Sequence, residues 1–221
     1  MKFQNIFTLL FILPFLSFAQ SFNMDSQVEM YLQKNFNQLG LSQNDYSDYS
    51  IYRAYESTQT GLTHVFLQQN YLGLPIHKAE IRLHYRADKG WLKTQNTFVN
   101  NVEGLQIFNQ TAFSRIQAIE SACRLLDIPY TKPKRISKKN ELTSLYQAEF
   151  SLSPIPVKSS YFLSNNSLRK VWDLTIYEND ASNYWNVLVD AVTGEILKKY
   201  NWVQHCTFNA EVACAHETHE T

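Results

Sequence analysis

The sequence predicts an α+β protein made of two small modules, each a helix packed on an antiparallel meander sheet. Apolar residues recur at helical spacing in residues 24–41 and again in residues 111–126. After each helical pattern come segments in which apolar and polar residues alternate, as they do in half-buried strands. Because each helix has its own strands, the chain is predicted to divide into residues 20–104 and residues 105–202.

The composition is that of a globular protein with no dominant charge. The 221 residues include 20 Lys and Arg and 20 Asp and Glu, so no net field attracts nucleic acid. Hydrophobic residues make up 44% and aromatic residues 14% of the chain, which is enough for a core and argues against disorder. The 6 Gly and 6 Pro exclude collagen-like and low-complexity proteins.

Residues 1–19 have the pattern of a secretory signal peptide. A lysine near the start is followed by an apolar run, and the small residues Ser17 and Ala19 suit cleavage before Gln20. The apolar run is shorter than the about 20 residues that a membrane-spanning helix needs. We therefore expect a secreted or periplasmic protein with no membrane segment after cleavage. An uncleaved anchor is the alternative.

The first module is predicted to begin with a helix over residues 24–41. Ser26 and Glu29 have the spacing of a capping box, and Gly40 can end the helix. Strands are expected to follow, joined by turns at 58–61, 73–75 and 88–90. These strands are predicted at residues 49–56, 64–71, 78–86 and 91–99.

The strand over residues 78–86 has the clearest period of two. Ala79, Ile81, Leu83 and Tyr85 alternate with charged or polar residues. This pattern predicts one buried face and one wet face.

The second module is predicted to begin with a helix from Thr111, as N-cap, to Leu126, ended by Pro129. The basic stretch 132–139 is interpreted as a solvated loop, with an anion-binding patch as the alternative. Three strands in hairpin order are expected near the end of the module, at residues 172–176, 184–189 and 195–200.

The turn between the last two strands has a specific chemistry. The Asp190 carboxylate can accept backbone N–H groups across the turn, and Gly194 can adopt the positive φ that other residues avoid. A calcium loop needs several oxygen ligands, and this turn carries only one carboxylate. We interpret it as a structural turn.

Residues 203–221 are predicted to form a flexible tail. An oxidising compartment favours a disulfide between Cys206 and Cys214, whereas Cys123 on an apolar helix face is expected to be a buried thiol. The alternative for the tail is a Zn²⁺ site, because thiolates and imidazoles are zinc ligands. Its ligands would come from His205, Cys206, Cys214, His216 and His219.

The other histidines and the tryptophans have ordinary structural interpretations. His64, His77 and His84 are expected to be exposed or half-buried, since they fall in strands or turns. Trp172, Trp185 and Trp202 are interpreted as core residues rather than a ligand platform. The sequence contains no nucleophile elbow or comparable context that would indicate Ser-His-Asp or Cys-His catalysis.

Two segments resemble the prodomain of secreted fungalysin-type zinc metallopeptidases. The run from Gly61 through Gln69 to Gly73-Leu-Pro75-Ile76 resembles the fungalysin/thermolysin propeptide motif. The polar pair His77-Lys78 departs from that pattern. Residues 172–200, with the turn containing Asp190, Thr193 and Gly194, resemble a PepSY-like module.

The resemblance implies a propeptide that inhibits the catalytic domain of such a peptidase and assists its folding, in cis or in trans. The family's zinc site needs His-Glu-x-x-His, which puts two imidazoles on one helix face with Glu as base. His216-Glu217 and His219-Glu220 do not complete this motif, so we expect no catalytic, cofactor-binding or metal site in this chain. Zinc would belong to the catalytic domain. An exported binding module unrelated to proteolysis is the alternative function.

Overall fold

The computed structural model describes residues 24–203, in which two α-helices, two short 3₁₀ helices and eleven strands are found. The helical segments are α1 (Met24–Asn35), η1 (Asn44–Tyr46), η2 (Val102–Gly104) and α2 (Arg115–Leu126). The strands are β1 (Tyr49–Glu56), β2 (Thr63–Tyr71), β3 (Leu74–Arg86), β4 (Gly90–Asn96), β5 (Gln106–Phe108), β6 (Lys134–Lys138), β7 (Thr143–Gln147), β8 (Ile155–Ser164), β9 (Ser167–Tyr177), β10 (Tyr184–Asp190) and β11 (Ile196–Asn201). The α+β class is confirmed.

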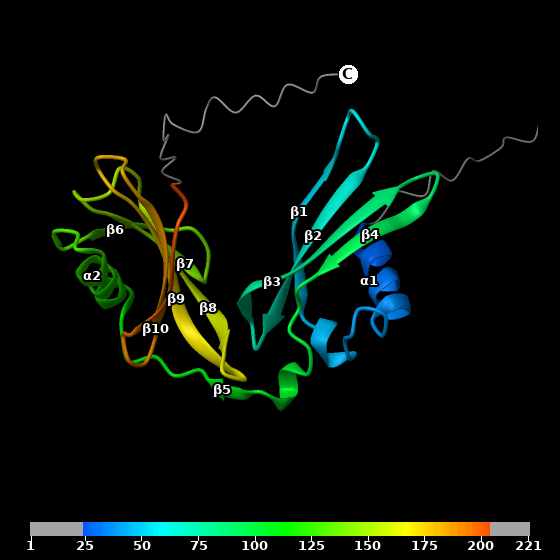
Figure 1. Cartoon of the computed structure of the whole chain (residues 1–221), viewed down its shortest axis with the longest axis horizontal. Coiled ribbons are helices and arrows are strands. Elements are labelled where there is room, and N and C mark those ends of the chain that lie inside the picture. The colour runs from blue at the N-terminus through cyan, green and yellow to red at the C-terminus, as the bar shows by residue number, and fades with distance from the viewer. Residues whose placement is uncertain (1–23, 204–221) are drawn as a thin grey trace, which may run out of the picture.

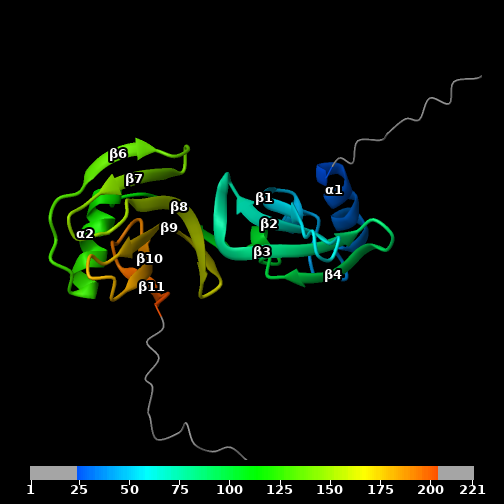
Figure 2. The same ribbon diagram turned by 90° about the horizontal axis from the view of Figure 1, so that it is seen from above.

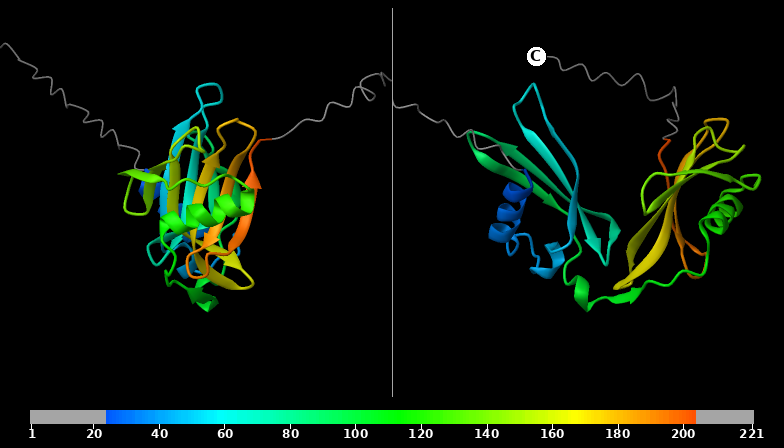
Figure 3. Two further views of the ribbon diagram at one scale, coloured as in Figure 1. Left: turned by 90° about the vertical axis from the view of Figure 1, so that its left-hand side faces the viewer. Right: turned by 180° about the vertical axis from the view of Figure 1, so that it is seen from behind.

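The two helices lie on the outer sides of the molecule (Figure 1). α1 covers one face of β1–β4, and α2 covers one face of the strands β7–β11. Seen from behind, the two groups of strands converge at one end, and their helix-free faces are turned toward each other (Figure 3). The view from above shows that the two groups meet where β3 approaches β8 (Figure 2).

α1 is held by an apolar stripe, as its sequence predicts. Val28 and Leu32 are fully buried. They pack in one core with the inward side chains of β2 and β3, which are Val65, Leu67, Ile81 and Leu83. Burying one such side chain contributes roughly 1.5–3 kcal/mol. The predicted alternation in β3 is confirmed, because Ile81 and Leu83 are buried while Arg82 between them is exposed.

The first helix is shorter than predicted. It ends at Asn35, and turns carry the chain to Gly40, where the Leu41 N–H donates to the Phe36 carbonyl at 3.0 Å. Asn is a poor residue for helix interiors because its side chain competes for backbone groups, and the Asn35 amide donates to the Tyr31 carbonyl at 2.8 Å. The helix is already formed at Met24, so Ser26 lies inside it and is not the N-cap.

The β2–β3 turn lies earlier than residues 73–75. Tyr71 pairs with Leu74 and Asn70 with Pro75, so the turn is the two residues Leu72 and Gly73. Both have positive φ, 48° and 75°, as two-residue hairpin turns of type I′ require. Pro75 is therefore already in β3 and is not a turn residue.

The N-terminus of α2 is at Ser114 rather than at Thr111. The Ser114 hydroxyl accepts from the Gln117 N–H at 3.3 Å, and the Gln117 side chain accepts from the Ser114 N–H at 2.9 Å. This reciprocal pair is a capping box. The residues just before this capping box are not part of the helix. Their N–H groups, those of Ala112 and Phe113, donate to the Ala191 carbonyl.

The core under α2 is built from the inward residues of β7–β10 and one face of the helix. Burial raises the pKa of the Cys123 thiol to about 12, with Glu120 adding to the effect, so the expected buried thiol is confirmed. The core contains Ala118, Ile119, Ala122 and Cys123 from α2 with Ile155, Val157, Trp172, Leu174, Ile176, Val187 and Val189 from the strands.

Residues 134–138 were predicted as part of a solvated loop, and this is wrong. They form β6, an edge strand that pairs with β7. Every residue of β6 is exposed, so its sequence lacks the alternation that marks a half-buried strand.

The β10–β11 turn is built as predicted. The Asp190 Oδ1 atom accepts the N–H groups of Val192 and Thr193 at 2.8 and 2.9 Å. Its other oxygen pairs with Arg169 at 2.8 Å, so this buried carboxylate is neutralised. The Thr193 hydroxyl accepts the Glu195 N–H at 3.2 Å, and Gly194 has φ of 74°.

All eleven strands belong to one hydrogen-bonded network. β3 joins β8 through a single parallel pair, Ile76 with Tyr161, and both lie in a third apolar cluster at the junction. β5 begins at Gln106, two residues after the predicted boundary at residue 104, and pairs with β9. The division into two separate modules stays a prediction.

We predict that Gly194→Ala destabilises the protein more than Gly73→Ala. The two glycines have nearly equal φ, 74° and 75°, so backbone strain of about 1–2 kcal/mol is common to both. Around Gly73 an added Cβ meets open space, whereas at Gly194 it would overlap the Phe113 ring. Overpacking adds about 1–3 kcal/mol at Gly194, measurable by urea unfolding. Equal losses would contradict the close packing of Phe113 on this turn.

Candidate functional site

The candidate site is the pair of helix-free faces that are turned toward each other, which we call the inner face. Register decides which side chains lie on it, because directly paired residues share a face. From β1–β3 these residues are Arg53, Tyr55, His64, Phe66, Gln68, Glu80, Arg82 and His84. From β8–β11 they are Lys158, Phe162, Asp173, Asn186 and Tyr200.

Aromatic rings cover the part of the inner face that β1 and β2 form. Tyr55 stacks on Phe66 with 6.0 Å between ring centroids, and the Arg53 guanidinium lies 4.7 Å from the Tyr55 ring centre. The Tyr52 ring also contacts Phe66, with 6.0 Å between centroids, and Tyr52 and Tyr55 are 51% and 42% exposed. Exposed aromatic rings beside an arginine are typical of protein-binding surfaces.

Charged side chains lie next to these rings. Arg82 pairs with Glu80 at 3.2 Å, and both line a hollow of about 510 Å³ with Lys78, Gln95 and neighbouring residues of β4. The Arg82 side chain remains 52% exposed. It is therefore available to a carboxylate of a partner.

A histidine pair lies on the same face, toward the β1–β2 turn. His64 and His84 are direct cross-strand partners, and their Nδ1 atoms are 2.8 Å apart. The rings are nearly perpendicular, and Tyr55 stacks on His64 with 5.0 Å between centroids. Both histidines are half-buried, as expected from their strand positions.

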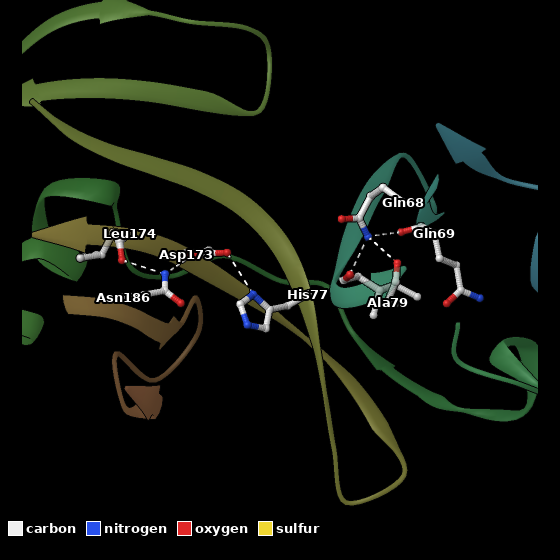
Figure 4. A network of polar contacts seen from close by, with 8 residues as sticks. Gln68, Gln69, His77, Ala79, Asp173, Leu174 and Asn186 are labelled. Carbon is white, nitrogen blue, oxygen red and sulfur yellow. Dashed lines mark hydrogen bonds and ion pairs between the residues drawn. The ribbon is translucent and has the colours of Figure 1, made fainter. Parts of the chain in front are cut away.

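A second histidine connects the two groups of strands. His77 of β3 reaches Asp173 of β9, with 3.1 Å between Nδ1 and Oδ2 (Figure 4). The other Asp173 oxygen accepts from the Asn186 amide at 2.6 Å. Phe162 and Tyr200 flank the His77 ring. The contact between the two groups of strands is thus both polar and aromatic.

The polar residues after the β2–β3 turn have a specific use. Lys78 has a positive φ of 59°, which interrupts the regular strand, and the consecutive side chains of His77 and Lys78 both contact Tyr200 of β11. The Lys78 Nζ lies 3.7 Å from the Tyr200 ring centre, a cation–π contact. In the sequence, the polar pair His77-Lys78 departs from the pattern of the propeptide motif. In the structure, both side chains contact the other group of strands.

Lys158 is a half-buried charged residue at this junction. Burial lowers the pKa of its ammonium, while the carboxylates of Asp173 and Glu80 act in the opposite direction. These carboxylates come from the two different groups of strands. Lys158 therefore adds an electrostatic link between them.

Gln69, a residue of the predicted propeptide motif, is fully buried and ties three segments together. Its Nε2 donates to the carbonyls of Asp45 and Val99 at 2.8 and 2.9 Å, and its Oε1 accepts the Val99 N–H at 2.7 Å. The preceding Gln68 donates to the Ile76 and Ala79 carbonyls across the irregular part of β3 (Figure 4). Both glutamines have structural roles.

The remaining predicted residues are partly outside the described range. The signal peptide, the Cys206–Cys214 pair and the histidines of the tail lie outside residues 24–203. Within that range, no group of three or more His, Cys, Asp or Glu side chains is placed to hold a metal ion. In the same residues, no helix is long and apolar enough to span a membrane.

Of the three tryptophans interpreted as core residues, Trp172 is buried and Trp185 is half-buried. Trp202 is 54% exposed, so the core interpretation is wrong there. Its ring packs edge-on against Tyr184 of β10.

Sequence reasoning missed the two histidine contacts. The alternation in β3 places His84 on the wet face, but only the register reveals His64 opposite it. The His77–Asp173 contact joins residues 96 positions apart and has no local signal.

Comparisons with known proteins give little more. No protein-family model and no curated protein match the sequence. Among solved structures, the chain is similar to the Bacillus megaterium YpeB C-terminal domain, with 7% identity and a TM-score of 0.36. The match covers 84% of this chain and 67% of that one. A TM-score this low does not establish a shared fold.

We predict that Gln69→Leu lowers the free energy of unfolding by about 2–4 kcal/mol. The change removes three hydrogen bonds and leaves buried backbone groups at Asp45 and Val99 without this partner. Asn70→Ala is the control, since Asn70 makes one exposed side-chain bond of 3.3 Å and should cost under about 0.5 kcal/mol. Urea unfolding measures both variants. A similar loss in the two would contradict the role given to Gln69.

We predict a coupling energy of about 1–2 kcal/mol between His77 and Asp173. Their side chains are only 10% and 20% exposed, so the contact is shielded from water. The measurement is a double-mutant cycle with His77→Ala and Asp173→Ala, followed by urea unfolding. The same cycle on the exposed pair Arg86–Asp88 is the control and should give about 0.2–0.5 kcal/mol. If the coupling energy between His77 and Asp173 does not exceed that between Arg86 and Asp88, the junction does not depend on the His77–Asp173 contact.

Proposed function

We propose that the chain is a propeptide-type inhibitor and folding assistant of a secreted fungalysin-type zinc metallopeptidase. It would act on the catalytic domain either in cis or in trans. The proposal includes the division into a propeptide-motif module and a PepSY-like module. It also assigns the protein no peptidase activity of its own.

The inner face is the observation that carries the proposal. Both helices are on the outer sides, so the inner face is the part of each sheet that no helix covers. It combines exposed aromatic rings with Arg82 and a hollow beside it. A surface of this kind suits a protein partner better than a small apolar ligand, for which an enclosed cavity is typical.

The physical basis of both activities is linkage. A domain that binds the native catalytic domain, but not its unfolded chain, stabilises the native state in proportion to its affinity. The same binding blocks substrate if it covers the cleft. Inhibition and folding assistance therefore require one interface, and we place it on the inner face.

The second candidate function is that of an exported binding module unrelated to proteolysis. The same aromatic and charged surface favours it, because nothing in these side chains is specific for a peptidase. It predicts binding to another partner and no effect on any metallopeptidase.

The experiment measures cleavage of casein by a purified fungalysin-type catalytic domain in the presence of micromolar amounts of this chain. We expect inhibition and a higher yield of active enzyme after refolding. Arg82→Ala should weaken inhibition at least about tenfold, because arginines on such faces are frequent binding hot spots. Its melting temperature should change little, since the Arg82 side chain is exposed.

Arg124→Ala is the matched control. Arg124 lies on α2, on the outer side, and its side chain is 77% exposed. Inhibition should be unchanged in this variant. If Arg124→Ala weakens inhibition as much as Arg82→Ala, the interface is not the inner face. If the unmodified chain neither binds the enzyme, nor inhibits it, nor aids its refolding, the proposed function is wrong.

A further inference from the structure

The His64–His84 pair has a geometry that goes beyond structural packing. The two residues sit directly opposite each other on adjacent antiparallel strands, so their Cβ positions are fixed by the sheet. The two Nδ1 atoms already converge, at 2.8 Å. In the neutral pair, one Nδ1–H donates to the other Nδ1, so at least one lone pair points at the space between the rings.

That spacing suits a metal ion held by two imidazoles. Metal–nitrogen bonds to histidine are about 2.0–2.1 Å long. With a right angle at the metal, as in tetragonal Cu²⁺ or Ni²⁺, the nitrogens would be about 2.9 Å apart. A tetrahedral angle, as for Zn²⁺, would need about 3.3 Å. The hydrogen-bonded separation of 2.8 Å is nearer to the value for a tetragonal ion, so less movement of the rings is needed to bind one.

The surroundings support binding in two ways. The nearest arginines on the same face of β3, Arg82 and Arg86, are each paired with a carboxylate, from Glu80 and Asp88 respectively. Their charge is thereby partly compensated, which reduces repulsion of a cation. The stacked Tyr55 ring also restricts His64, so less rotamer freedom is lost on binding.

We propose that His64 and His84 form a two-imidazole site for a borderline transition-metal ion, with Cu²⁺ preferred over Zn²⁺. Both rings bind through Nδ1, and the proton shared between these atoms moves to the Nε2 of its ring. The ion links β2 and β3, and water fills its other positions. This site is separate from the catalytic zinc of any peptidase and does not depend on the proposed function.

The test is a titration of the full chain with Cu²⁺, followed by calorimetry and by electron paramagnetic resonance. Histidines and cysteines of the tail are first replaced, because they are potential ligands. The background substitutions are His205→Gln, Cys206→Ser, Cys214→Ser, His216→Gln and His219→Gln. We expect one ion per chain, a tetragonal spectrum with hyperfine coupling to two imidazole nitrogens, and a higher melting temperature with Cu²⁺ than without.

His64→Gln and His84→Gln, made singly in this background, should each lower the Cu²⁺ affinity at least about tenfold. His77→Gln is the control, since His77 lies at the junction, and it should leave the affinity unchanged. The melting temperature without metal checks that each variant folds. If a variant does not fold, the proposal is judged on the electron paramagnetic resonance spectrum of the parent, which is the chain with the background substitutions alone.

Two results would overturn the proposal. One is an affinity that is the same in the parent and in folded His64→Gln and His84→Gln variants. The other is a parent spectrum without coupling to two imidazole nitrogens. Tighter binding of Zn²⁺ than of Cu²⁺ would overturn the stated preference, because the 2.8 Å spacing would then not set the coordination geometry.

Discussion

The structure depends on the way β3 takes part in both groups of strands at once. Its early part lies in the apolar cluster at the junction, where Ile76 pairs with Tyr161 of β8. Its later part forms the core under α1 through Ile81 and Leu83. Because one strand belongs to both groups, the position of the inner face is set by the backbone of β3. The His77–Asp173 contact then fixes a side chain across the same junction.

The irregular segment of β3 also decides which residues meet on the inner face. Asn70 pairs with Pro75, but Gln68 pairs with Glu80, so β3 contains extra residues between these pairs. A regular hairpin from the Leu72–Gly73 turn would place Ile81 opposite His64. The irregularity instead brings His84 there. A local change in register thus creates the histidine pair and keeps Ile81 in the core.

Sequence patterns predicted the elements that have a regular period and missed those that do not. The alternation in β3 and the turn around Asp190 were read from local signals, and the structure agrees. β8 was missed because its buried positions include Ser159 and Ser160, which break the apolar pattern. Within the inner face, the exposed position of Arg82 followed from alternation. The histidine contacts did not, since they depend on register and on long-range contacts.

The exposed basic strand β6 has a consequence for self-association. An edge strand offers unpaired backbone N–H and C=O groups to another copy of the chain. The protein has no net charge, so long-range repulsion between copies is weak. Lys134 and Arg135 place like charges along this edge, and a second β6 would bring the same charges against them. The stretch that resembles a loop in the sequence therefore protects the sheet against aggregation through that edge.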